Sequence, residues 1–123
     1  MDKKFRLLVI DDNEEILTSL KSFLSKKSYD VVSASNGLDA LKLIEAATDD
    51  FDLVITDLVM PNISGVAVTA IIKKQNPKMP VIAITGYGEQ PEALAKEVHA
   101  DIVMEKPFKL DQLEKAIKRL LSI

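Results

Sequence analysis

The chain has 123 residues, which is enough for one domain and too short for two of ordinary size. Its 47% apolar residues can build a packed core, and the lack of cysteine excludes disulfides, thiolate metal sites and a cysteine nucleophile. A net charge of -3, from 16 basic and 19 acidic residues, lacks the positive field that attracts a phosphate backbone. We therefore expect no direct binding of nucleic acid.

The chain shows no pattern for export or for membrane insertion. No run approaches the roughly 18 apolar residues of a membrane span, and the charged N-terminus lacks the apolar run of a signal peptide. No linker rich in Ser, Pro or Gly divides the chain, and the last helical pattern runs nearly to Ile123. We expect a cytoplasmic protein in which residues 1–123 form a single domain without an output domain, either as a stand-alone protein or as a part of a longer one.

Strand and helix patterns alternate along the whole chain. Short runs rich in Val and Ile are typical of buried parallel strands, and they predict strands over 7–10, 31–34, 53–55, 81–84 and 102–104. Apolar residues at helical spacing predict helices over 16–24, 38–44, 66–72, 89–98 and 110–121. This alternation predicts an α/β fold: a doubly wound, five-stranded parallel sheet with helices on both faces.

Polar residues stand where these predicted strands end. The first strand is followed by Asp11 and Asp12, the third ends at Asp57, the fourth at Thr85, and the fifth is followed by Lys106. Open α/β sheets bind their ligands at the carboxyl ends of the strands, so these side chains are expected to converge on one rim. Each alone has an ordinary explanation, since Asp12 or Asn13 could be the N-cap of the next helix and Thr85 a turn residue, but together they favour a site.

The residue types indicate phosphoryl chemistry. Three carboxylates at close range repel one another unless a cation intervenes, and oxygen ligands that leave room for water and phosphate favour Mg²⁺ over Ca²⁺. A lysine ammonium and a threonine hydroxyl can hold further phosphoryl oxygens. The sequence therefore predicts a Mg²⁺ site of Asp11, Asp12 and Asp57, with Lys106 and Thr85 arranged around a phosphoryl group on Asp57.

Four segments resemble the receiver domains of two-component response regulators, in the family's order and over essentially the whole chain. They are Leu8–Asn13, Ile55–Pro61, Ile84–Gly86 and Glu105–Phe108. The resemblance implies the flavodoxin-like strand order 2-1-3-4-5. It also implies that Asp57 accepts a phosphoryl group from a phosphohistidine of a sensor histidine kinase or histidine phosphotransfer protein. A downstream protein would then bind the switched surface, and the resemblance leaves open whether a homodimer forms.

The resemblance also assigns roles within the site. Asp12, Asp57 and the backbone carbonyl of Val59 would bind Mg²⁺ directly, and Asp11 would bind it directly or through water. Lys106 would pair with Asp57 at rest and with the phosphoryl group afterwards. Thr85 would move toward a phosphoryl oxygen and carry its loop with it.

Three positions depart from the usual family pattern or bear on the lifetime of the phosphoryl group. Val103 stands where many members carry an aromatic residue that changes rotamer, so half of the usual switch is missing. Val59 and Tyr87 are placed by the resemblance beside the path of an attacking water, and both side chains are poor at positioning water. We therefore expect slow spontaneous hydrolysis of the aspartyl phosphate.

Three other functions fit parts of the pattern. An aspartyl-phosphate phosphatase of the haloacid dehalogenase type needs a second Asp two residues after the nucleophile, where this chain has Val59. A flavin-binding module of similar fold binds phosphate after the first strand, where Asp11 and Asp12 would repel it. A receiver-like interaction module that works without phosphorylation stays as the alternative. We expect a signalling domain that is not an enzyme.

Overall fold

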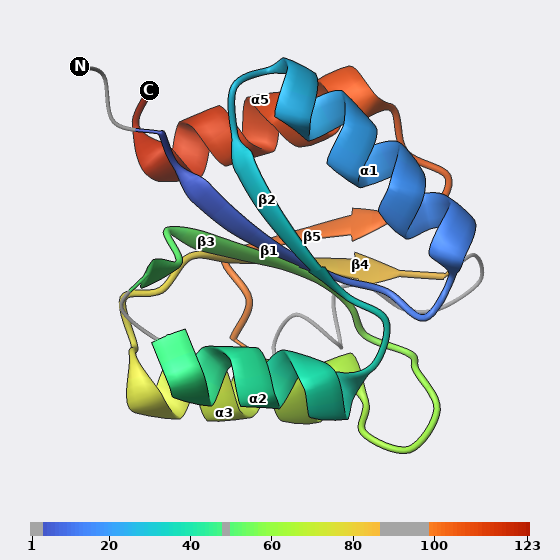
Figure 1. The fold of residues 1–123 in the computed structure, drawn as a ribbon, viewed down its shortest axis with the longest axis vertical. Coiled ribbons are helices and arrows are strands. Elements are labelled where there is room, and N and C mark those ends of the chain that lie inside the picture. The colour runs from blue at the N-terminus through green and yellow to red at the C-terminus, as the bar shows by residue number, and fades with distance from the viewer. Residues whose placement is uncertain (1–3, 48–49, 87–98) are drawn as a thin grey trace.

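The computed structural model describes residues 4–47, 50–86 and 99–123. Within these ranges the chain forms five strands and four helices (Figure 1). They are β1 (Arg6–Ile10), α1 (Glu14–Lys26), β2 (Asp30–Ala34), α2 (Gly37–Ala47), β3 (Leu53–Asp57), α3 (Gly65–Gln75), β4 (Val81–Thr85), β5 (Ile102–Glu105) and α5 (Leu110–Leu121). The helix expected over 89–98 lies outside the described residues.

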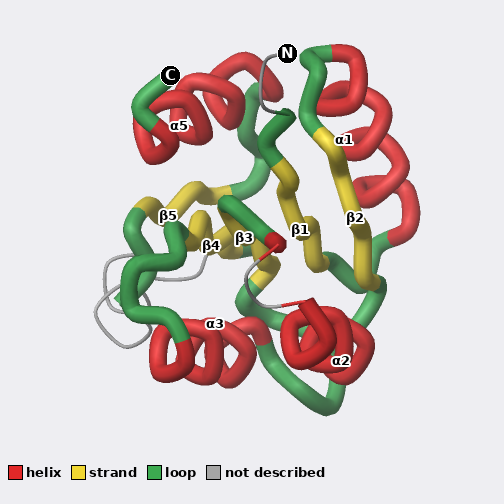
Figure 2. The backbone as a smooth tube through the Cα atoms, turned by 60° about the vertical axis from the view of Figure 1, so that its left-hand side comes forward, coloured by secondary structure: helices red, strands yellow, loops and turns green. Residues whose placement is uncertain are grey.

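The strands form one sheet in which every neighbouring pair is parallel, in the order β2-β1-β3-β4-β5. Figure 1 shows α1 and α5 on one face of this sheet and α2 and α3 on the other, and Figure 2 shows the same layers from another side. The predicted α/β class, the doubly wound architecture and the strand order 2-1-3-4-5 are confirmed. The direction of winding reverses between β1 and β3, and open sheets of this kind bind ligands at that point.

The core lies in two layers because successive strand side chains point to opposite faces. In β1, Leu7 and Val9 pack toward α1 and α5, whereas Leu8 and Ile10 pack toward α2 and α3. All five positions of β3 and of β4 are buried, so these two strands form the interior of the sheet. In the described part of the chain, no helix combines the length and apolar character that a membrane span requires.

Helix α1 begins directly after the acidic end of β1, and Asn13 sets where it begins. The side-chain oxygen of Asn13 accepts hydrogen bonds from the backbone N–H groups of Glu15, at 2.9 Å, and Ile16, at 3.2 Å. These are the contacts of an N-cap residue, which satisfies helical N–H groups that have no partner in the helix. Asp12 does not fill this role, so its carboxylate is not needed to start the helix.

The cap assignment can be tested by comparing two neighbouring substitutions. Asn13→Ala removes the acceptor for two backbone N–H groups and should lower the free energy of unfolding by about 1 kcal/mol. Asp12→Ala should cause no comparable loss, because the exposed Asp12 side chain does not cap the helix. Urea unfolding of the Mg²⁺-free proteins measures both changes. Equal losses in the two variants would contradict the assignment.

Candidate functional site

Four strands deliver the predicted residues to the carboxyl edge of the sheet. Asp57 is the last residue of β3 and Thr85 the last of β4. The backbone N–H of Lys106 donates to the carbonyl of Thr85 at 2.8 Å, which joins the ends of β4 and β5. On the other side, Asp11 follows β1 and hydrogen-bonds through its backbone N–H to the Ala34 carbonyl at the end of β2. The predicted convergence is therefore present in the backbone itself.

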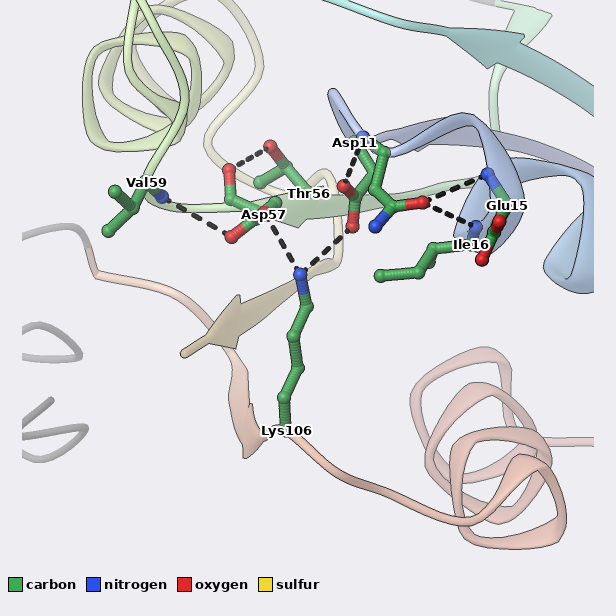
Figure 3. Close-up of polar contacts among 8 residues, drawn as sticks. Asp11, Glu15, Ile16, Thr56, Asp57, Val59 and Lys106 are labelled. Atoms are coloured by element: carbon green, nitrogen blue, oxygen red, sulfur yellow. Dashed lines mark hydrogen bonds and ion pairs between the residues drawn. The ribbon is translucent and has the colours of Figure 1, made fainter. Parts of the chain in front are cut away.

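Lys106 connects the two buried carboxylates of the site. Its ammonium nitrogen lies 3.1 Å from Oδ2 of Asp57 and 3.3 Å from Oδ2 of Asp11. Figure 3 shows the extended lysine side chain reaching from the end of β5 to a point between the two aspartates. Asp11 and Asp57 are 1% and 5% exposed, so little water screens these contacts. The lysine is thus the nearest positive charge to both acids in the described chain.

Both oxygens of the Asp57 carboxylate have polar neighbours. Oδ2 faces Lys106, and Oδ1 accepts a hydrogen bond from the backbone N–H of Val59 at 3.3 Å. The backbone carbonyl of Asp57 accepts from the Thr56 hydroxyl at 2.9 Å (Figure 3). These contacts fix the orientation of the carboxylate before any ligand arrives.

Three carboxylates form a group that fits a hard cation. One ligand oxygen from each of Asp11, Asp12 and Asp57 lies within 4.8 Å of the others. Oδ2 of Asp11 is buried, and the Lys106 ammonium at 3.3 Å is the contact that the described residues give it. One ammonium cannot neutralise three carboxylates, and oxygen-only ligands are the set that Mg²⁺ and Ca²⁺ prefer. The residues present therefore fit the metal that the sequence predicts.

Burial and neighbouring charges shift the pKa values of two groups in the site. Burial raises the pKa of the Asp11 carboxyl, the hydrogen bond from the backbone N–H of Asn13 opposes the rise, and the charge of Asp57 adds to it. Burial alone would lower the pKa of Lys106. The hydrogen bond to Asp57 and the charges of Asp11 and Asp57 outweigh burial, so the pKa of Lys106 is raised. The lysine is held in its charged form, whereas ionised Asp11 is disfavoured.

The hydroxyl of Thr85 is buried at the same edge. Its side chain is 0% exposed, and Oγ1 has no hydrogen-bond partner among the described residues. A buried hydroxyl without a partner costs free energy, and such groups call for a functional explanation. Thr85 is thus placed at the edge predicted for it, with its donor unused.

Of the three positions that depart from the usual family pattern or bear on the lifetime of the phosphoryl group, two lie within the described residues. The side chain of Val59 is 58% exposed beside Asp57 and has no polar atom to offer. Val103 is half-buried on β5 and packs against a small cluster that contains Leu58 and Ala83. No aromatic side chain stands at that position to change rotamer. The third residue, Tyr87, lies outside the described residues.

Sequence reasoning missed how closely α3 approaches the site. The backbone of Gly65, the first residue of α3, lies against that of Asp57. No local pattern in the sequence indicates this contact, because Gly65 and Asp57 meet only when α3 folds back against the sheet. Asn13, which the sequence predicts only as a possible N-cap, also donates its backbone N–H to Oδ1 of Asp11 at 2.9 Å.

An open parallel sheet of this strand order, with an acidic cluster and a lysine on its carboxyl edge, places the chain among flavodoxin-like domains with a ligand site at the switch point. The model of the response regulator receiver domain matches residues 7–118, which is nearly the entire chain. The chain belongs to the response regulator receiver domain family. Such a domain is a phosphoacceptor signalling module and not a conventional enzyme.

Individual relatives agree with this assignment. The alkaline phosphatase synthesis transcriptional regulatory protein PhoP of Bacillus subtilis is 35% identical over 122 residues, which are 98% of this chain and 49% of PhoP. This chain thus spans about half the length of that relative. A receiver domain from Clostridium thermocellum superposes with a TM-score of 0.89 at 33% identity, covering 96% of this chain and 94% of that one.

A further solved structure bears on the metal. The response regulator TrrA of Thermotoga maritima, solved in complex with Mg²⁺-BeF, is 35% identical and superposes with a TM-score of 0.82. The match covers 95% of this chain and 99% of TrrA. The acidic group of Asp11, Asp12 and Asp57 is consistent with a receiver-domain metal site of this kind.

The raised pKa of Asp11 leads to a prediction for the Mg²⁺-free protein. The native state binds this proton more tightly than the unfolded chain, so the group favours folding at low pH, and this contribution is lost as pH rises through the raised pKa. Asp11→Asn should therefore be more stable than the parent at about pH 7, and the gap should narrow toward about pH 5. Urea unfolding in EDTA measures the gap.

The matched control for this prediction is Glu45→Gln, which neutralises an exposed carboxylate on α2 away from the site. Its stability should follow that of the parent at both pH values, because exposed charges contribute little. A parent that is more stable than Asp11→Asn at neutral pH would contradict the electrostatic account of the site.

Proposed function

We propose that this domain accepts a phosphoryl group on Asp57 from a phosphohistidine of a sensor histidine kinase or histidine phosphotransfer protein. The observation that carries the proposal is the position of the Asp57 carboxylate. It is buried at the switch point of the sheet, 3.1 Å from the Lys106 ammonium and within the acidic group. The modified domain would then present an altered surface to a downstream protein, in the cytoplasm.

Mg²⁺ would be held by Asp11, Asp12, Asp57 and the backbone carbonyl of Val59. When bound, the ion supplies positive charge that draws in a phosphoryl donor and stabilises the charge on the phosphoryl oxygens during transfer. The similarity to TrrA, which was solved with Mg²⁺-BeF, supports this choice of metal. The chain's own contribution is to hold the carboxylates close together in a buried rim.

The transfer needs a nucleophile, a leaving group and donors around the phosphoryl oxygens. A carboxylate oxygen of Asp57 forms the new P–O bond while the P–N bond to the donor imidazole breaks, and the imidazole nitrogen keeps the electron pair. Lys106 stays protonated, in keeping with its raised pKa, and pairs with a phosphoryl oxygen. The unpartnered hydroxyl of Thr85 becomes a donor to another oxygen.

Mass spectrometry of the intact protein tests the phosphoacceptor. Incubation with acetyl phosphate and Mg²⁺ should add the mass of one phosphoryl group to the parent, because Asp57 is the oriented nucleophile of the site. Asp57→Asn should gain no mass, and neither should the parent in EDTA.

The matched control is Asp50→Asn, which changes an exposed carboxylate 3.5 Å from Arg6 at the opposite edge of the sheet. It should be labelled like the parent. No mass gain on the parent, or equal gains on the parent and Asp57→Asn, would contradict the proposal. An unlabelled but folded parent would favour the alternative, an interaction module that works without phosphorylation.

The exposed valine beside Asp57 leads to a prediction about lifetime. Val59 offers no hydrogen bond to an attacking water, so the aspartyl phosphate should hydrolyse slowly. Val59→Asn places an amide at the same exposed position and should shorten the half-life several-fold by orienting water. Loss of label after removal of the donor measures the rate. Equal or slower decay in Val59→Asn than in the parent would contradict the role of Val59.

A further inference from the structure

Gly65, the first residue of α3, is buried against the backbone of the phosphoacceptor strand. A β-carbon placed on Gly65 would overlap the carbonyl oxygen of Asp57, and it would lie 2.7 Å from both the carbonyl carbon of Asp57 and Cα of Leu58. All three are backbone atoms, so no side-chain rotation could relieve the overlap. Any other residue at position 65 must displace either α3 or the end of β3.

The same contact closes the loop that follows Asp57. The backbone N–H of Gly65 donates to the carbonyl of Leu58 at 3.0 Å, and the Ser64 hydroxyl accepts from the N–H of Ala67 at 3.2 Å to cap α3. Residues 58–64 are thereby folded back on the end of β3. This loop carries Val59, whose N–H orients Oδ1 of Asp57 and whose carbonyl is a proposed metal ligand.

A second glycine holds the other end of the loop. Gly37, the first residue of α2, lies against Ile63, and a β-carbon there would be 2.6 Å from the Ile63 carbonyl oxygen and 2.7 Å from its Cβ. The loop 58–64 is thus enclosed by the first turns of two helices, each of which begins with a residue that has no side chain. The two glycines contact different parts of the chain: Gly65 lies against Asp57 itself, and Gly37 lies against Ile63 at the far end of the loop.

We propose that Gly65 is a positioning residue for metal binding and phosphoryl transfer at Asp57, a role that rests on the function proposed above. The missing side chain lets α3 start directly on the Asp57 carbonyl, and this sets the backbone of both Asp57 and Val59. A larger residue shifts the Asp57 carboxylate from Lys106 and also displaces the backbone of Val59, whose carbonyl is a proposed metal ligand. The substitution should therefore weaken the site more than it weakens the packing of α3, since the rest of the helix packs through other residues, among them Val68 and Ile72.

The test separates Mg²⁺ affinity from stability. Mg²⁺ is titrated into the parent, Gly65→Ala and Val68→Ala, and binding is followed by two-dimensional NMR, while melting temperatures are measured in EDTA. Val68→Ala is the matched control, because Val68 is a fully buried residue of α3 that packs in the core and not on Asp57. Gly65→Ala should bind Mg²⁺ about tenfold more weakly or worse, as is typical when support for a metal ligand is lost. Val68→Ala should melt earlier and keep the parent's affinity.

Each outcome bears on one claim. Unchanged Mg²⁺ affinity in a folded Gly65→Ala, or an equal loss of affinity in Val68→Ala, would overturn the positioning role. If Gly65→Ala does not fold, Gly37→Ala decides: it should weaken Mg²⁺ binding several-fold by pressing on Ile63, and parental affinity would overturn the inference. A parent that binds Mg²⁺ and is labelled, beside an equally competent Gly65→Ala, sinks this inference alone. A parent that does neither sinks the proposed function as well.

Discussion

The contact of one ammonium with two buried carboxylates is the interaction on which the site depends. Lys106 lies between Asp57 and Asp11 where little water reaches, and a buried charge is tolerated only when it is paired. The pairing is incomplete, because one lysine contacts two carboxylates and a third, that of Asp12, lies beside them. An arrangement of this kind retains a demand for more positive charge, which a divalent metal ion can meet.

The fold allows these charged groups to be buried without disrupting the core. Each charged residue stands at a strand end, above a core that remains apolar on both faces. The reversal of winding between β1 and β3 places the helices that follow them on opposite faces of the sheet, which leaves the carboxyl edge between these strands to the side chains of Asp11 and Asp57. Asn13 takes over the capping of α1, and the carboxylates beside it are left for ligands.

Much of this could be predicted from the sequence because two strong signals coincide. Runs such as Leu7–Ile10 are apolar without interruption and indicate buried parallel strands, and their ends carry the polar residues that the sheet then gathers. Local details, such as the residue that caps a helix, were harder to predict. Asp12 and Asn13 are both good N-caps, and only the backbone geometry decides between them. The contact of Gly65 with Asp57 depends on how α3 returns to the sheet, a long-range property without a local signature.

The uneven burial of the strands determines which parts of the domain are free to respond to a modification. All residues of β3 and β4 are enclosed on both faces, and close-packed interiors resist small displacements. In β5 the first three residues are only half-buried and the last is exposed, with the compact Val103 among them. The centre of the sheet is therefore the part that resists displacement, and the less buried outer strand β5 is the part of the sheet with most room to respond.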